Sequence, residues 1–224
     1  MYKFSLILLC IFLFHSCIYF RPPRRVANNF EFCYDGEIKN QTIKTEGYYQ
    51  LKKNWWNTSG AGENYNPRWD TSIINFKFFP DGICIYEIRM EKYLDNLNDS
   101  INKHPFEEYA RFNGLYKVNS DTIKIQVVND VRLAAPTWGA FEFVYIIIDE
   151  KKLKYLGFRV LTNEKFYANK FVFAKDKMDE EKNSFIANYV PLQNIPPSGT
   201  WLKNLKWFWC SKEEYKKWKK SKKN

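Results

Sequence analysis

Histidine is nearly absent from this chain, which has two among its 224 residues. His15 lies in an apolar N-terminal stretch, and His104 precedes Pro105 in a polar one. A metal site would therefore depend on carboxylates and Cys84, and a Ser-His-Asp triad would have to use His104. The sequence favours neither arrangement, so we expect no metal and no other cofactor.

Other patterns of catalysis are missing as well. No glycine-rich phosphate loop follows a strand-like run. Glu107 and Glu108 are adjacent, so they would point apart on a strand and about 100° apart on a helix. Glycoside hydrolysis instead needs two carboxylates held at a set separation across a cleft. We expect a protein that is not an enzyme, and we keep a hydrolase of unrecognised type as the third interpretation of function.

The N-terminal apolar stretch is too short for a typical membrane-spanning helix, which needs ~20 residues. Residues 4–20 number 17 and are interrupted by His15 and Ser16. The stretch has instead the parts of a secretory signal, with Lys3 before an apolar core and the small Ser16 before Cys17. Residues 1–16 are therefore expected to be a signal peptide.

Ser16-Cys17 resembles the lipobox of Gram-negative bacterial lipoproteins, in which the cysteine is lipidated and becomes the new N-terminus. The resemblance implies that Cys17 carries acyl chains such as palmitate and anchors the protein in the cell envelope. Surface-exported lipoproteins of this type often carry an acidic cluster after the cysteine, and the residues after Cys17 lack one. The resemblance therefore implies a protein of the outer membrane that faces the periplasm. A transmembrane anchor and an ordinary secreted protein are the two alternatives.

The net charge of +10 is confined to the ends of the chain. Residues 203–224 hold nine Lys and two Glu, Arg21, Arg24 and Arg25 add three charges, and residues 26–202 carry a net −1. Nucleic-acid binding needs a basic surface interleaved with groups that read or stack on bases. The neutral body does not offer one, so no nucleic-acid partner is expected.

Eight strand-like runs separated by turns follow the N-terminal region. They are residues 46–51, 72–79, 83–90, 112–118, 122–128, 140–148, 153–161 and 167–175. Alternation is clear where Ile74, Phe76 and Phe78 share one face. Turn-forming residues join three successive pairs at 80–82, 119–121 and 149–152. Consecutive tight hairpins make a meander, so we expect an all-β, eight-stranded, antiparallel up-and-down barrel that leaves no open edge.

Four short motifs carry a family resemblance. They are Gly47-Tyr48-Tyr49, Phe79-Pro80-Asp81-Gly82, Gly114-Leu115-Tyr116 and Asp121-Thr122-Ile123. Their spacing resembles that of the lipocalin-like lipoproteins of Gram-negative bacteria over about residues 45–175. The resemblance implies a calycin-type barrel that can hold a small apolar ligand, and it supplies no catalytic residue.

Connection lengths indicate which end of the barrel is functional. The three short hairpins share one end, and the long connections 52–71, 91–111 and 129–139 leave from the other. The long connections carry aromatic residues, and together with the inward-facing Tyr86 these form the candidate ligand site: Trp55, Trp56, Trp69, Tyr93 and Trp138. The alternative is that these aromatics plug the barrel as core, because eight strands enclose a space that side chains can fill.

Cysteine pairing follows from barrel closure and from an oxidising compartment. Once Cys10 is removed and Cys17 is lipidated, Cys33, Cys84 and Cys210 remain. Cys84 lies on the apolar face of its strand, whereas Cys33 precedes the first strand and Cys210 follows the last. Closure brings those two segments together, so a Cys33–Cys210 disulfide is predicted, against the alternative of three free buried thiols.

The predicted organisation places a membrane-proximal linker at residues 17–30, the barrel domain at 31–200 and an aromatic, then Lys-rich, segment at 201–224. The aromatic part should dock on the barrel wall. Ser211 and Glu214 form a capping-box pattern that predicts a short C-terminal helix. This helix is either a solvated basic helix or a contact for anionic lipid headgroups.

We therefore expect a membrane-anchored lipocalin-like protein that binds a small apolar ligand at the long-loop end. An envelope protein-interaction module with a plugged barrel is the second interpretation, in which the partner is another envelope protein. The two differ in whether the barrel has an accessible apolar site beneath the long loops.

Labelled palmitate should be incorporated into the wild-type protein and lost in Cys17→Ala, because the Cys17 thiol is the attachment atom of a lipoprotein anchor. Metabolic labelling of cells that express each form measures this, and Cys84→Ala should label as the wild type does. Equal labelling of wild type and Cys17→Ala would contradict the anchor.

Overall fold

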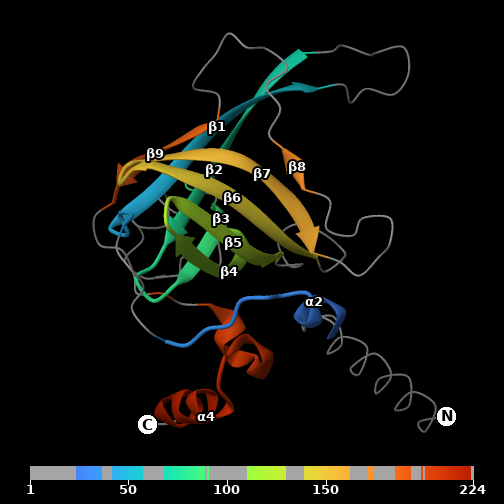
Figure 1. Cartoon of the computed structure of the whole chain (residues 1–224), viewed down its shortest axis with the longest axis vertical. Coiled ribbons are helices and arrows are strands. Elements are labelled where there is room, and N and C mark those ends of the chain that lie inside the picture. Colours follow the sequence, from blue (N-terminus) through green and yellow to red (C-terminus); the bar gives the residue numbers. More distant parts are fainter. Residues whose placement is uncertain are drawn as a thin grey trace, which may run out of the picture.

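The computed structural model describes residues 24–36, 42–57, 68–88, 90, 110–129, 139–161, 171–173, 185–192, 198 and 200–222 (Figure 1). Its strands are β1 (Gly47–Asn57), β2 (Arg68–Phe78), β3 (Ile83–Ile88), β4 (Ala110–Asn119), β5 (Thr122–Asn129), β6 (Ala140–Asp149), β7 (Lys152–Leu161), β8 (Val172–Phe173) and β9 (Ile186–Pro191). Its helices are α2 (Arg24–Asn28), η2 (Trp201–Asn204), η3 (Lys206–Phe208) and α4 (Lys212–Ser221).

The strands form a closed antiparallel barrel. Strands β1 to β7 follow one another around the sheet, and β9 lies between β7 and β1 and completes the circle (Figure 1). Every pairing is antiparallel, and the three short hairpins lie at one end as their turn residues predicted. The eight-stranded up-and-down barrel expected from the sequence is therefore confirmed.

The eighth strand of the barrel is not where the sequence placed it. Residues 167–175 were predicted as that strand, but within them the described strand is only β8, which pairs with Gly157 and Phe158 of β7. The barrel is closed by β9 instead, which pairs with β1 from Gly47 to Leu51. β9 is short, and three of its six residues, Ala, Asn and Pro, are types depleted in strands, so its pairing with the distant β1 determines its place.

Aromatic side chains fill the interior of the barrel toward the hairpin end. Ring centroids lie 4.6 Å apart for Phe78 and Tyr116, and 5.0 Å apart for Phe76 and Tyr145. The completely or almost completely buried interior rings are Tyr49, Phe76, Phe78, Tyr86, Tyr116 and Tyr145. Packed rings exclude water and contribute large apolar areas, so this half of the barrel is a solid core.

Buried tyrosine hydroxyls in this core have hydrogen-bond partners. Tyr49 donates to the carbonyl oxygen of Glu150 at 2.7 Å, and Tyr116 donates to that of Phe79 at 2.9 Å. The hydroxyls of Tyr86 and Tyr145 bond each other at 2.8 Å. These bonds offset the desolvation of the hydroxyl groups, and two of them attach the core to the hairpin turns.

Gly114 shows why one motif glycine is needed. A Cβ atom at this position would lie 1.9 Å from the carbonyl oxygen of Gln126 on the neighbouring strand. Only glycine allows β4 and β5 to approach so closely.

A second core covers the outside of the barrel wall. The N-terminal segment (residues 24–34) and the C-terminal segment (residues 200–210) pack against the outer face of β3 to β6. Leu202 and Phe208 are completely buried there, as expected for a docked aromatic segment. The predicted linker 17–30 therefore includes residues that fold onto the barrel, because Val26 is buried against Val128, Ala140 and Leu161.

A disulfide joins the two outer segments. Cys33 is bonded to Cys210 across a sequence separation of 177 residues, as predicted, and Cys84 is free and buried in the interior. Backbone bonds flank the disulfide, since the N–H of Tyr34 donates to Phe208 O and the N–H of Cys210 donates to Tyr34 O. In the chain-entropy model, a loop of this length stabilises the fold by about 5 kcal/mol.

Lys77 is a buried amine on the outer face of β2. Lys77 is 0% exposed, and its Nζ donates to the carbonyl oxygens of Thr45 at 2.6 Å and Gly47 at 3.0 Å. Nζ also lies 4.8 Å from the ring centroid of Phe79. Burial lowers the pKa of Lys77 to about 8, while the nearby Glu46 carboxylate opposes this shift.

We expect the wild type to gain about 2 kcal/mol of unfolding free energy relative to Lys77→Met between pH 8 and pH 10. The folded lysine loses its proton near pH 8, whereas the unfolded lysine keeps it to about pH 10.4. The unfolded state therefore binds more protons in this window, so stability rises with pH. Urea unfolding at both pH values measures the difference.

Burial raises the pKa of Cys84 and of the interior tyrosines, which gives the opposite slope, but equally in both proteins. Lys124→Met at an exposed position should keep the wild-type pH profile. Parallel profiles for wild type and Lys77→Met would show that Lys77 does not titrate as proposed.

Candidate functional site

The end of the barrel opposite the short hairpins is the candidate site. β1 and β2 are longer than predicted, so the connection between them is 58–67 rather than 52–71. The backbones of Trp55, Trp56 and Trp69 belong to this strand pair, with Trp56 opposite Trp69. The expectation that these tryptophans lie in a loop is therefore corrected. Their side chains, and the whole of Tyr93 and Trp138, lie outside the described residues.

Four phenylalanines line the interior at this end, and we call them the Phe floor: Phe112, Phe141, Phe143 and Phe158. Phe112 lies close to the start of β4, after the long connection from β3, and Phe141 lies at the start of β6, after the long connection from β5. Phe158 lies close to the end of β7, at the same end of the barrel. Ring centroids are 5.4 Å apart for Phe112 and Phe141, and 6.1 Å apart for Phe143 and Phe158.

The floor is less covered than the core beneath it. Phe141 and Phe158 are half-buried and Phe143 is 9% exposed, whereas Phe76 and Tyr145 are 0% exposed. Burial thus decreases along the barrel axis toward the long connections. Partly exposed aromatic side chains at the open end of a barrel are the kind of apolar lining that small-molecule sites have.

Tyr86 lies directly below the floor. Its ring stacks on Phe143 at 4.3 Å, and it is 1% exposed. Burial raises the pKa of both Tyr86 and Tyr145, so this hydroxyl pair stays neutral at physiological pH and cannot serve as a base. The structure therefore places Tyr86 as support for the floor rather than as its surface.

Alternation along the runs 140–148 and 153–161 predicts Phe143 and Phe158 to face inward, whereas Phe112 and Phe141 were not identified from the sequence. The missed residues are among the first of β4 and β6, where each strand follows a long connection and its starting residue was hard to place from the sequence. Alternation could have found Phe141, because it shares the parity of Phe143 and Tyr145.

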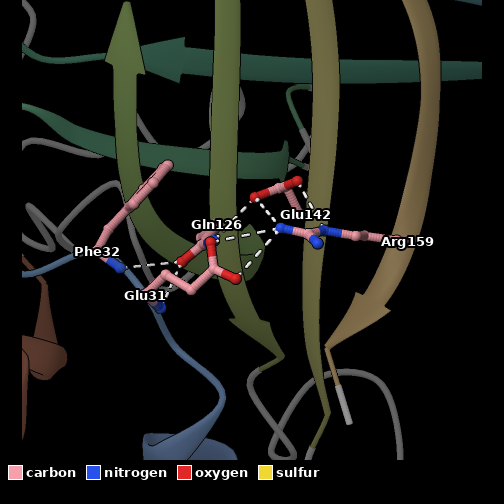
Figure 2. Close-up of polar contacts among 5 residues, drawn as sticks. All are labelled: Glu31, Phe32, Gln126, Glu142 and Arg159. Atoms are coloured by element: carbon pink, nitrogen blue, oxygen red, sulfur yellow. Dashed lines mark hydrogen bonds and ion pairs between the residues drawn. The ribbon is translucent and has the colours of Figure 1, made fainter. Parts of the chain in front are cut away.

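A polar cluster on the outer wall holds the N-terminal segment (Figure 2). Gln126 Oε1 accepts from the backbone N–H groups of Glu31 at 2.8 Å and Phe32 at 3.0 Å. Gln126 Nε2 donates to Glu142 at 2.8 Å and to Glu31 at 3.2 Å. One side-chain amide thereby satisfies two backbone N–H groups of the docked segment and also donates to two carboxylates, one from the segment and one from β6.

Glu142 is the buried charge of this cluster. It is 2% exposed, and Arg159 donates two hydrogen bonds to its carboxylate, from Nε at 2.8 Å and from Nη2 at 3.1 Å (Figure 2). The hydrogen bond from Arg159 to Glu142 raises the pKa of the guanidinium, which stays charged. The side chains of the cluster are paired with one another, and Gln126 binds the backbone of the N-terminal segment. The cluster therefore attaches this segment to the outer wall.

Asp81 performs a similar role at the hairpin end. Its Oδ2 accepts from the Tyr34 hydroxyl at 3.0 Å, from Lys203 Nζ at 3.2 Å and from the Ser198 hydroxyl. Lys203 also lies 4.8 Å from the ring centroid of Tyr34. One turn residue thus joins the β2–β3 hairpin to both outer segments.

Two further properties hold for the described part of the chain. It contains no group of three or more His, Cys, Asp and Glu side chains arranged as metal ligands would be. Within the same residues, none of the helices is both long and apolar enough to cross a bilayer.

Comparison with known proteins gives no relative: no family model matches the chain, and no curated protein or solved structure is significantly similar to it. The class that the fold defines is an eight-stranded antiparallel barrel consistent with the calycin type. The functional argument therefore starts from the Phe floor and from the outer segments.

Arg159→Met should lower the free energy of unfolding by about 2–3 kcal/mol, because it leaves Glu142 buried without a cation. This is somewhat below the usual range for a buried pair, since a fifth of the Arg159 side chain is exposed. Arg159→Met with Glu142→Leu should recover most of the loss. Urea unfolding of the single and double variants measures both values.

Lys44→Met is the matched control. It removes the exposed Lys44–Glu150 pair at 3.2 Å and should change stability by less than about 1 kcal/mol. If Arg159→Met has an equally small effect, the outer-wall cluster does not hold the N-terminal segment.

Proposed function

We propose that the protein is an envelope lipoprotein, anchored through Cys17, whose barrel binds a small apolar molecule on the Phe floor. The observation that carries the proposal is the half-buried state of Phe141 and Phe158 above a fully packed core. An aromatic surface of this kind is stabilised when a ligand removes it from water, at roughly 25 cal/mol per Å² of apolar area.

The filled interior limits what such a ligand can be. Phe76, Phe78 and Tyr145 occupy the hairpin half of the barrel, so a ligand would rest on the floor instead of entering the full depth. Flat rings or the end of an acyl chain suit stacked phenylalanine faces. The floor side chains are hydrocarbon, and they contribute binding without proton transfer. Trp55, Trp56 and Trp138 would cover the ligand from the long-loop end.

The anchor would hold the barrel close to the membrane. Six residues separate Cys17 from the first residue of α2, and the N-terminal segment that follows is docked on the outer wall. A fully extended tether of six residues spans about 20 Å. Periplasmic placement on the outer membrane is part of this proposal.

A protein-interaction module is the second candidate. The observation in its favour is the solid aromatic core, which leaves the hairpin half of the barrel without room for a ligand. In this case the long connections would form the surface for an envelope protein partner. The two candidates differ in whether a small apolar molecule binds the Phe floor.

An apolar fluorescent probe should bind the wild type and quench its tryptophan emission, and Trp55→Ala/Trp56→Ala/Trp138→Ala should bind at least about tenfold more weakly. Each contact aromatic commonly contributes over about 1 kcal/mol to binding. Phe141→Ser should also weaken binding of the probe. Titration of the purified proteins measures affinity, and thermal melts report folding.

Trp218→Ala on α4 is the matched control and should bind the probe like the wild type. The alternative has a different signature. If the wild type binds no probe and the triple variant loses about 3–5 kcal/mol of stability, these tryptophans are core plugs and the protein-interaction candidate replaces ligand binding.

A further inference from the structure

Helix α4 carries a dense array of positive charge. Its residues and C-cap include six exposed lysines: Lys212, Lys216, Lys217, Lys219, Lys220 and Lys222. The two acidic residues, Glu213 and Glu214, lie in the first turn, where the helix dipole favours them. The segment therefore has a net charge of +4, while residues 26–202 carry −1.

The helix is fixed to the rest of the protein. Ser211 caps it by accepting from the N–H groups of Glu213 and Glu214. Trp218 packs on Trp209 with ring centroids 5.6 Å apart, and the Tyr215 hydroxyl donates to Asn204 O at 3.2 Å. These contacts give the lysine array a defined orientation, although none of the helix residues is fully buried.

Aromatic rings lie among the charges. Lys222 Nζ is 4.8 Å from the ring centroid of Trp218, and Lys219 Nζ is 5.8 Å from that of Tyr215. Both rings are half-buried. Trp and Tyr are favoured at membrane interfaces because one part of the ring is apolar and the other is polar.

The position of α4 relates it to the N-terminal segment. Ring contacts run from Phe30 to Trp207 at 5.5 Å, from Tyr34 to Trp209 at 4.9 Å and from Trp209 to Trp218. Figure 1 shows α2 and α4 on the same side of the barrel. The N-terminal segment and α4 thus lie on the same side of the barrel.

We infer that α4 is a second membrane contact, whose lysines bind the phosphates of anionic lipid headgroups. The inference uses the proposed Cys17 anchor for its choice of partner, because a tether of about 20 Å keeps the helix near a bilayer. Each Lys near an anionic surface adds to the attraction, which decays within a Debye length. A lipid chain combined with a basic patch gives stable attachment where one acyl chain alone is marginal.

This contact would orient the barrel. With an anchor alone, the molecule could rotate about its tether, whereas two attachment points on one side hold that side toward the lipid. The long-loop end would then keep a constant relation to the membrane surface.

Vesicle co-sedimentation of residues 18–224 tests the contact without an acyl chain, since this form retains every described residue. It should bind mixed phosphatidylglycerol–phosphatidylcholine vesicles, release them as salt rises, and ignore pure phosphatidylcholine. Lys216→Gln/Lys217→Gln/Lys219→Gln/Lys220→Gln should weaken binding at least about tenfold.

The control variant changes four exposed lysines of the barrel, Lys124, Lys151, Lys152 and Lys154, to Gln. It lowers the net charge equally and should bind vesicles like the wild type, with both variants melting at the wild-type temperature. Equal loss in the two variants would mean that only net charge matters, and would overturn the inference. So would binding to an acidic protein but not to anionic vesicles.

Failure here is separable from failure of the proposed function. The anchor is measured by palmitate labelling at Cys17 and the ligand site by the apolar probe, and neither depends on the α4 lysines. If residues 18–224 do not bind anionic vesicles while Cys17 is labelled with palmitate, the protein is a lipoprotein whose basic helix is only solvated.

Discussion

Closure of the barrel by β9 is the constraint on which the remaining structure depends. β9 joins β7 to β1, and its last residues pair with the first residues of β1. The chain is thereby delivered to the hairpin end, where Ser198 and Lys203 reach Asp81. From this point the C-terminal segment covers the outer wall, meets Tyr34 and aligns Cys210 with Cys33. The position of α4 follows from the same path.

The wall formed by β3 to β6 has apolar groups on both faces, which is unusual for an antiparallel sheet with one solvated side. Ile83 and Ile85 face the outer segments, while Cys84 and Tyr86 face the interior, and all four are buried. The few polar groups on the outer face, such as Gln126 and Glu142, are paired with the docked chain. The outer segments are therefore a structural layer of the domain.

Local sequence predicted most of the barrel because its hairpins are local. Alternation and the short turns placed β3 to β7 to within two residues at each end, whereas β1 and β2 were underestimated by six and four residues at their long-loop ends. β9 was missed because its partner β1 is distant in sequence and half of its six residues are types depleted in strands. The Gln126 cluster was equally hidden, since Gln126 is polar on a strand and its backbone partners lie 94 and 95 residues away. The Cys33–Cys210 pair was predictable because closure itself brings those positions together.

The path of the chain has a consequence for how it folds. The pairing of Gly47 with Pro191 closes a loop that contains nearly all of the barrel, so the contacts that complete the domain are among the most distant in sequence. Folding slows as contact order rises, and all-β domains of this kind fold in milliseconds to seconds. Cys33 and Cys210 both lie outside the loop that this pairing closes, so the disulfide joins the two segments that flank the circle of strands. Until β9 pairs, the edge of β1 presents a row of unpaired N–H and C=O groups to which another chain can add a strand, so incomplete closure exposes the protein to aggregation.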